Sequence, residues 1–566
     1  MKKLISRRKF IKDSFQTCAA AGVSGNILFK GLTEKKSFDI VIKKGILMDG
    51  SGGEAREADI AVKEGLIAEI GRIPAESGKR VIDARNLMVC PGFIDAHDHT
   101  DAGLLVNPKG ESHIRQGITT LVSGNCGSSP FPLSDSVYEK MRHDLKSAYG
   151  IDLNWRDING FFQILEKSGT ALNYSSFIGQ GTLRGAVVGF QDRHPTPEEM
   201  TAMQRILKEG IRNGALGIST GLEYAPGSYA EDEEILDLCR TAAQAGGLYS
   251  THMRDEGDAL LESLKETIKI ARKAKIGLQV SHLKCAYPRN WHKTDQALDI
   301  ITQAGEKGED IFCDRYPYIA GATSLSSLNF PLWAQQGTTE DFLKRLQDPD
   351  LENRFRSFLK KREEKLGSWD KVMISSVATS KNRACEGRTV KECAEASGKD
   401  IFVFLRDLLV EENDRVNMVV FMMKEENLKK ILSHPLVGVG CDGSVRAPYG
   451  PLSRGKPHPR SYGTFPRLFG KYIREEKLLP LSRMIHKVTA VPAARFGFSR
   501  RGLVKRGFFA DLAVFDFDKI QDKATYQNPH QYPKGISYVL VNGNIVIKEE
   551  THTGKLPGKI LRNTRT

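Results

Sequence analysis

PGFIDAHDHTD, residues 91–101, ends an apolar run in two histidines that alternate with acidic residues. The stretch LMVCPGFID is apolar and β-prone, with a break at Pro91 and Gly92, which predicts a buried strand. Successive side chains on a strand point to opposite faces, so His97 and His99 share one face. Taken alone, such a motif is more often a pair of hydrogen-bonded structural histidines, so the rest of the chain has to decide.

Downstream of residue 101, short apolar strands alternate with helices. The predicted strands are GITTLVSGNCG, SSFIGQG, GALGISTGLEY, GGLYSTHMRD, IGLQVSHLK, DIFCDRYPY and VGVGCDG, and the clearest helices are PTPEEMTAMQRILKEGIRNG and Asp258 to Lys275. Repeated βα units of this spacing indicate an α/β fold with a parallel sheet or a (β/α)8 barrel. We expect the barrel to span residues 91–495, with a charge-rich insertion near 325–388.

Both ends of the chain carry another pattern, in which short strands are separated by glycine-rich turns. At one end these are FDIVIKKGILMDGSG, ADIAVKEGLIAEIG and KRVIDARNLMVCPGF, and at the other GFFADLAVFDF and ISYVLVNGNIVIKE. The last of these contains Asn542-Gly543, a strong hairpin signal. We therefore expect residues 36–90 and 496–566 to pair into one small β-sandwich domain.

The first 30 residues differ from the rest in charge. They hold seven basic side chains against one acidic one, and they include SRRKFIK. The whole chain has a formal net charge of +14. This motif resembles the twin-arginine export signal and predicts a periplasmic or otherwise exported protein. A basic disordered tail is the alternative.

Composition excludes several classes of partner. The sequence contains no run of about 18 apolar residues that would predict a membrane span. We therefore expect no stable membrane insertion once the signal is removed. The remaining basic residues form no cluster interleaved with aromatics, so no nucleic-acid partner is expected. The nine cysteines are scattered and do not form a disulfide framework. The expected partner is a small molecule, and the sequence does not set an oligomeric state.

The polar residues that can bind a metal recur at predicted strand ends. They are His97 and His99, then Cys126 in SGNCG, His252 in STHMRDEG, His282 in VSHLK and Asp442 in GVGCDG. Imidazole, thiolate and carboxylate are the ligands that a zinc-type ion prefers. A single buried histidine or cysteine is more often a core residue. Agreement in type and order along the chain favours a metal site.

As a set, PGFIDAHDHTD, SGNCG, STGLEYAPG, THMRDEG, VSHLK, GCDG and HPRSYGTFPR resemble the amidohydrolase superfamily, in particular its N-acyl-D-amino-acid deacylase branch. The resemblance runs from Phe38 to Lys548 and implies a metal-dependent (β/α)8 barrel with a small β-sandwich. It implies a tightly held Zn²⁺ at Cys126, His252 and His282, and a weaker second site at His97, His99 and Asp442. No carboxylated lysine is evident, so Cys126 would take the bridging part.

The resemblance also implies roles in catalysis and substrate binding. Asp442 would act as the catalytic base. Carboxylate-binding positions match Lys284 and Arg460, and hydrogen-bond donors match Tyr318 and Ser324, although Tyr316 could replace Tyr318. Tyr224 would line the side-chain pocket, and Glu223 could approach the metals.

The function predicted from this resemblance is hydrolysis of N-acyl-D-amino acids to a carboxylate and a free D-amino acid. Two alternatives remain at this point. One is another amidohydrolase reaction, either hydantoinase-like ring opening, which a bridging lysine would favour, or a dipeptidase-like cleavage. The other is a barrel that has lost its metals and only binds a ligand, for which substituted ligand positions would be the signature.

Overall fold

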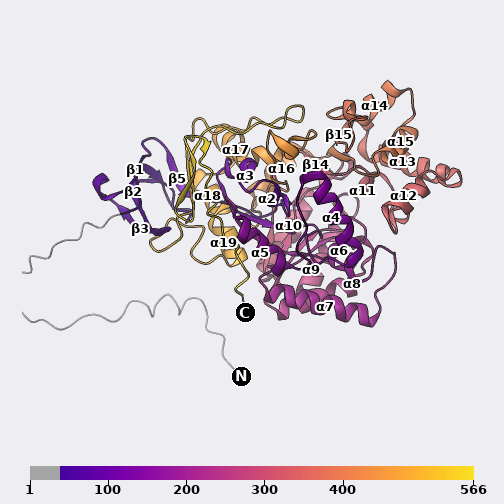
Figure 1. Ribbon diagram of the computed structural model, residues 1–566, viewed down its shortest axis with the longest axis horizontal. Coiled ribbons are helices and arrows are strands. Elements are labelled where there is room, and N and C mark those ends of the chain that lie inside the picture. Colours follow the sequence, from indigo (N-terminus) through magenta and orange to yellow (C-terminus); the bar gives the residue numbers. More distant parts are fainter. Residues whose placement is uncertain (1–37, 566) are drawn as a thin grey trace, which may run out of the picture. The chain divides into compact units, whose positions relative to one another are not determined.

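Strands from both ends of the described chain form one nine-stranded sheet in the computed structural model, which describes residues 38–565 (Figure 1). The order is β20-β19-β18-β17-β5-β1-β2-β3, with β4 beside β1. The strands are β1 (Ile40–Leu47), β2 (Arg56–Lys63), β3 (Leu66–Gly71), β4 (Val81–Asp83), β5 (Met88–Pro91), β17 (Leu512–Phe515), β18 (Ile536–Val541), β19 (Asn544–Lys548) and β20 (Thr551–His552). Antiparallel pairing of β17 with β5 joins the two ends. The predicted pairing of the two chain ends is thus confirmed, within one sheet, and the predicted leader lies outside the described residues.

The predicted hairpin at Asn542 and Gly543 connects β18 and β19. Both residues have positive φ, 46° and 75°, as a two-residue turn of this kind requires. A Cβ on Gly543 would lie 2.4 Å from the Cα of Gly65, so only glycine fits there. The Asn542 amide donates to Asn173 Oδ1 and to the Pro557 carbonyl, both at 2.8 Å. Because Asn173 begins a barrel strand, this turn fastens the sheet to the barrel.

Parallel strands close into a ring, which confirms the predicted barrel. The strands are β6 (Phe93–Asp95), β7 (Ile118–Ser123), β8 (Asn173–Ser176), β9 (Ile178–Gly179), β10 (Gly217–Gly221), β11 (Leu248–His252), β12 (Leu278–Val280) and β13 (Ile311–Cys313). Pairing runs from β6 through β7 to β8, and from β9 through β10, β11 and β12 to β13. β8 and β9 are separated only by Phe177 and occupy one position. Residues 437–443 close the ring, through parallel bridges from Val437 to Cys313 and from Gly443 to Asp98.

Helices follow the barrel strands and pack their apolar faces on the ring. They are α2 (Gly103–Val106), α3 (Glu111–Ile114), α4 (Asp135–Tyr149), α5 (Ile158–Ser168), α6 (Gln180–Val187), α7 (Pro197–Arg212), α8 (Asp232–Gln244), α9 (Leu260–Ala274), α10 (Thr294–Glu306), α16 (Glu425–Ser433), α17 (Arg460–Arg467), α18 (Leu481–Val488) and α19 (Ala490–Phe496). The start of α7 shows why the chain turns helical there: Thr196 and Glu199 form a reciprocal capping box, and Pro197 occupies the first helical position between them. Such a cap stabilises a helix by about 1 kcal/mol.

A separate subdomain interrupts the barrel between β13 and α16 (Figure 1). Its strands β14 (Ala320–Ser324), β15 (Val372–Ser376) and β16 (Asn417–Phe421) form an antiparallel sheet in the order β14-β16-β15. Its helices are α11 (Leu325–Asn329), α12 (Thr339–Leu346), α13 (Glu352–Leu366), α14 (Val390–Ser397) and α15 (Ile401–Glu411). These elements enclose their own apolar core.

The insertion predicted near 325–388 is therefore only part of a segment that runs from Ala320 to Phe421. High charge marks α12 and α13, and this was the signal in the sequence. High charge does not mark α15, IFVFLRDLLVE, because this helix buries its apolar residues in the subdomain core. Within residues 38–565, no helix is long and apolar enough to cross a membrane.

Candidate metal centre

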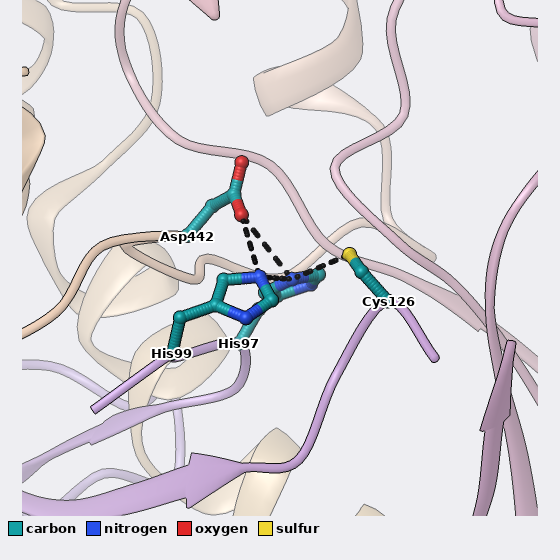
Figure 2. A group of neighbouring side chains, drawn as sticks. All are labelled: His97, His99, Cys126 and Asp442. Carbon is teal, nitrogen blue, oxygen red and sulfur yellow. Dashed lines mark hydrogen bonds and ion pairs between the residues drawn. The ribbon is translucent and has the colours of Figure 1, made fainter. Parts of the chain in front are cut away.

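Side chains from separate strand ends of the barrel converge around the sulfur of Cys126. They form two groups of metal-binding type that share this cysteine: His97, His99, Cys126 and Asp442 in one (Figure 2), and Cys126, His252 and His282 in the other. Within each group, the ligand atoms all lie within 4.8 Å of one another. The structure thus brings together every residue that the sequence predicted as a ligand.

The first group is a compact cluster of nitrogen, sulfur and oxygen atoms. Nε2 of His97 lies 3.3 Å from Nε2 of His99 and 3.4 Å from Sγ of Cys126. Oδ1 of Asp442 lies 3.1 Å from Nε2 of His99. In the second group, Nε2 of His282 is 3.2 Å from the same sulfur, and the His252 ring packs 4.6 Å from the His282 ring. One sulfur therefore faces both sets of imidazoles.

The backbone at three of these residues adopts a conformation that L residues rarely take. Cys126, His282 and Asp442 have φ of 51°, 34° and 51°. Such strain persists only where the surroundings hold it, and it concentrates at functional sites. Here the Asp442 amide donates to the His97 carbonyl at 2.7 Å, and the His282 amide donates to Asp314 at 2.8 Å.

Asp314, a buried carboxylate, orients one of the histidines. Nδ1 of His97 lies 3.2 Å from Asp314 Oδ2, so a neutral ring that donates from Nδ1 would direct the lone pair of Nε2 at the cluster. Metal-binding histidines usually make such a second bond to a carboxylate, because it fixes both the tautomer and the ring. Asp314 is itself held by the Gln279 amide at 2.8 Å.

Glu256 acts on the second group. Its Oε1 lies 3.0 Å from Nδ1 of His282, and its Oε2 lies 3.5 Å from Nε2 of His252. Lys284 pairs with the same carboxylate and also lies 2.7 Å from Nδ1 of His282. Burial opposes ionisation of Glu256, but His252 and Lys284 outweigh it and lower its pKa well below the usual range.

Asp95, at the end of β6, connects the first and last positions of the ring. Its Oδ1 accepts from the amide of His97 at 3.2 Å and from the amide of Cys441 at 2.8 Å. These two amides belong to the turns that carry His97 and Asp442. Asp95 is completely buried, so this bond pattern is protected from water.

Electrostatics favour the forms of Cys126 and Asp442 that bind cations. Burial alone would raise the pKa of the Cys126 thiol, but His97 and His282 lower it well below its ordinary value. Burial likewise opposes ionisation of Asp442, and the Arg460 guanidinium, which donates to Oδ2 at 2.6 Å, reverses this and holds the pKa of the carboxyl low. A thiolate and a carboxylate are the protonation states that bind a metal.

A cavity of about 700 Å³ opens over the two groups. This is the size of a small-molecule site. Most of the residues predicted to bind substrate line it, namely Lys284, Ser324, Arg460 and Tyr224, together with Tyr316 and Glu223. Tyr224 packs its ring 4.7 Å from that of His252. Glu223 lies 3.0 Å from Nε2 of His252, as the sequence suggested it could.

Tyr318 is the exception, because it does not line the cavity. Its ring packs 5.1 Å from His458 and 4.8 Å from the Arg467 guanidinium. Residues two apart in an extended strand would share a face, but here the Tyr318 amide donates to the Tyr316 carbonyl at 3.0 Å and closes a tight turn. The turn sends the two rings in different directions, and Tyr316 is the one that reaches the cavity.

Comparison with known proteins places the chain in a family. The Amidohydrolase family model matches residues 80–547. The chain belongs to the amidohydrolase family. It is 34% identical over 532 residues to a D-aminoacylase of Alcaligenes xylosoxydans xylosoxydans, covering 94% of this chain and 99% of the relative. It is 33% identical to an N-acyl-D-aspartate deacylase of the same organism, covering 92% and 95%.

A solved structure gives the same result in three dimensions. An N-acyl-D-glutamate deacylase from Bordetella bronchiseptica, complexed with zinc and a phosphonate inhibitor, superposes on this amidohydrolase with a TM-score of 0.79. The two chains are 31% identical, and the match covers 93% of this chain and all of the other.

Asp314 and Glu256 are two residues of this amidohydrolase that sequence reasoning missed. Asp314 directly follows β13, so the rule that located the ligands at strand ends could have found it. Glu256 stands four residues after His252 in THMRDEG, where nothing in the pattern separates it from the neighbouring Asp255. Only the fold shows that Glu256 turns back to His252 and His282.

Proposed function

We propose that this amidohydrolase hydrolyses the amide bond of N-acyl-D-amino acids, giving a carboxylate and a free D-amino acid. The observation that carries the proposal is the sharing of Cys126 between both ligand groups, beside a cavity that Arg460 lines. The activities for which two relatives are named, D-aminoacylase and N-acyl-D-aspartate deacylase, agree with it. A thiolate in the shared position leaves no place for the bridging lysine of a hydantoinase-type centre.

The donor set fits a zinc-type ion. Thiolate and imidazole donors at Cys126, His252 and His282 would hold one Zn²⁺ tightly, and His97, His99 and Asp442 would form a second, weaker position. When bound, such an ion polarises the scissile carbonyl and lowers the pKa of a bound water from about 15.7 towards 7.

Asp442 would move the proton. Arg460 keeps its carboxyl ionised, and its Oδ1 faces the ligand cluster, where the attacking water would lie. As the water oxygen bonds to the carbonyl carbon, Asp442 takes the proton, and it returns this proton to the amine nitrogen when the C–N bond breaks. One carboxylate thus serves as base and then as acid.

Arg460 would also recognise the α-carboxylate of the substrate. Its planar fork matches a carboxylate, and one arm is already fixed by Asp442. Lys284 lines the same cavity, with its charge paired to Glu256. If the α-carboxylate lies on Arg460 and the amide carbonyl at the metal centre, two substituents of Cα are fixed. The substrate side chain then reaches its pocket, which Tyr224 lines, in only one of the two enantiomers.

The test is metal analysis of the purified protein together with N-acetyl-D- and N-acetyl-L-amino acids and a hydantoin. We expect bound zinc and turnover of D substrates only. A preference for L substrates, or ring opening of the hydantoin without deacylation, would refute the proposed activity. Metal-free protein that gains no activity on adding Zn²⁺ would favour a barrel that only binds ligands.

We also propose that SRRKFIK directs export by the twin-arginine route, on the strength of the sequence motif alone. The test is to change Arg7 and Arg8 to lysine and to measure the protein in periplasmic and cytoplasmic fractions. Loss from the periplasm is expected. An unchanged periplasmic amount would mean that the segment is an ordinary basic tail.

A further inference from the structure

The charges that line the cavity do not balance. Its acidic residues are Glu223, Glu256 and Asp442, and its basic residues are Lys284, Arg446, Arg454 and Arg460. Each acid is already engaged: Glu256 with Lys284, Asp442 with Arg460, and Glu223 with His252. Two arginines of the lining, Arg446 and Arg454, are left without an acidic partner among the residues that the structure describes.

Arg446 is the more enclosed of the two. It is half-buried, and its Nε is shielded from water without a hydrogen-bond partner. Burial lowers the pKa of its guanidinium, and only the phenols of Tyr149 and Tyr462 oppose this effect. In the described part of the chain, no carboxylate lies within ion-pair distance of it. An arginine held in this way has lost part of its hydration, at Nε, without gaining a counter-charge.

The backbone that carries Arg446 is firmly held beside the metal centre. The Ser444 hydroxyl donates to the His99 carbonyl at 3.0 Å, and the Val445 amide donates to Thr100 Oγ1 at 3.1 Å. The Arg446 amide donates to Ser112 Oγ at 2.8 Å. The segment is therefore pinned to the residues that follow the His97–His99 motif, and its position does not depend on a free loop.

Arg446 is also within reach of a bound substrate. It stands four residues after Asp442, and four residues span at most roughly 14 Å when fully extended. Its side chain faces the same cavity as Asp442 and Arg460. A substrate that spans a few bonds from its reacting carbonyl can therefore place a charged end at Arg446 while Arg460 holds the α-carboxylate.

We propose that Arg446, supported by the exposed Arg454 at the rim, binds a second negative charge on the substrate. The protein would then prefer dianionic N-acyl-amino acids to those with a neutral side chain and a neutral acyl group. This inference rests on the proposed deacylase function. The second charge can come from an acidic side chain, as in N-acetyl-D-glutamate, or from an acidic acyl group, as in N-succinyl-D-leucine.

The test compares matched substrates with the zinc-loaded protein. N-acetyl-D-glutamate is paired with N-acetyl-D-glutamine, and N-succinyl-D-leucine with N-acetyl-D-leucine. We expect kcat/KM to favour the dianionic member of at least one pair, and the favoured pair identifies the source of the charge. Arg446→Gln should reduce this preference by about 10- to 100-fold, which is what one hydrogen bond to a charged group is worth.

Two further variants make the result specific. Arg446→Glu should discriminate against the dianionic substrate more strongly than Arg446→Gln, because it adds repulsion. Arg205→Gln, an exposed substitution on α7 outside the cavity, is the matched control and should keep the wild-type preference. An equal loss on both members of a pair in Arg446→Gln would overturn the inference, as would a wild-type preference for the neutral members.

Failure of the deacylase proposal itself gives a different result. Turnover of neutral substrates alone refutes the inference and leaves the deacylase, whereas no turnover of any N-acyl-D-amino acid refutes the deacylase. Calorimetric binding of D-glutamate and D-glutamine to wild type and Arg446→Gln tests the side-chain charge in either case. Tighter binding of D-glutamate that depends on Arg446 supports a site for that charge, and equal binding of the two ligands excludes it.

Discussion

The metal centre and the remaining wall of its cavity are built in different ways. The metal-binding residues come from strand ends of one closed ring, and buried carboxylates such as Asp314 hold them from behind. Much of the remaining wall comes from the subdomain between Ala320 and Phe421, which has a core of its own. Ser324 and Met418 belong to that wall.

This difference separates two tasks. A ligand on the ring cannot shift without disturbing neighbouring strands, because the ring is closed and close-packed. The wall can change its lining through side chains anchored in a second core, with no effect on the barrel. We therefore expect substitutions at the ring to abolish the chemistry, and substitutions along the wall to alter which substrate is used.

The largest effect should follow from Cys126→Ala. Because the sulfur serves both ligand groups, its loss should release the tightly bound metal and abolish measurable turnover. Metal content by elemental analysis and the rate with N-acetyl-D-amino acids check this. Cys239→Ala, a buried cysteine on α8, is the control and should keep both. Retained metal and full activity in Cys126→Ala would remove this residue from the site.

Asp442→Asn should keep most of the metal and lose turnover by at least about 10²-fold, because the amide cannot carry the proton. Stopped assays at saturating substrate, on protein of measured metal content, give the comparison. The exposed Asp518→Asn serves as the control. Turnover within a few-fold of wild type would mean that another group moves the proton.

Asp314→Asn should weaken metal binding by about 10- to 100-fold, since His97 loses the carboxylate that fixes its tautomer. Competition with a chelator measures this affinity directly, and saturating metal should restore much of the turnover. Asp299→Asn, exposed on α10, should leave the affinity unchanged. If Asp314→Asn bound metal as tightly as wild type, the ring would hold its ligands without this support.

The smallest effect tests the wall. Tyr316→Phe should lower kcat/KM by about 10-fold, because the buried Tyr316 hydroxyl has no partner among residues 38–565 and would bond to the substrate carboxylate. Tyr318→Phe is its matched control and should change kcat/KM little, since Tyr318 does not line the cavity. A larger loss of kcat/KM in Tyr318→Phe than in Tyr316→Phe would show that the turn between the two tyrosines opens when substrate binds.

The sequence predicted the barrel and its ligands for a definite reason. Parallel strands place their carboxyl ends at one edge, so strand-end residues such as Cys126 and His282 can be recognised without knowing their distances. The pairing of the two chain ends was equally predictable, because both carry the same strand and turn pattern. Both inferences depend on the direction of the strands and on their order along the chain, and the periodicity of the sequence indicates these.

What the sequence did not supply depends on turns and on charge partners. The turn at Tyr316 and Tyr318 is a single backbone hydrogen bond that no residue preference marks. The role of Glu256 requires the chain to bend back onto His252 within four residues. The bounds of the subdomain were missed because α15 is apolar, which makes it resemble a barrel helix.

The pairing of β5 with β17 has a consequence for how the protein is made. These strands meet at Met88–Pro91 and Leu512–Phe515, about 420 residues apart in the chain. At a synthesis rate of roughly 5–20 residues per second, the first strands wait about 20–80 s on the ribosome for their partner. During that interval, β5 presents an unpaired apolar edge, the feature by which nascent chains aggregate. This edge therefore stays without its partner strand until the last tenth of the chain is translated.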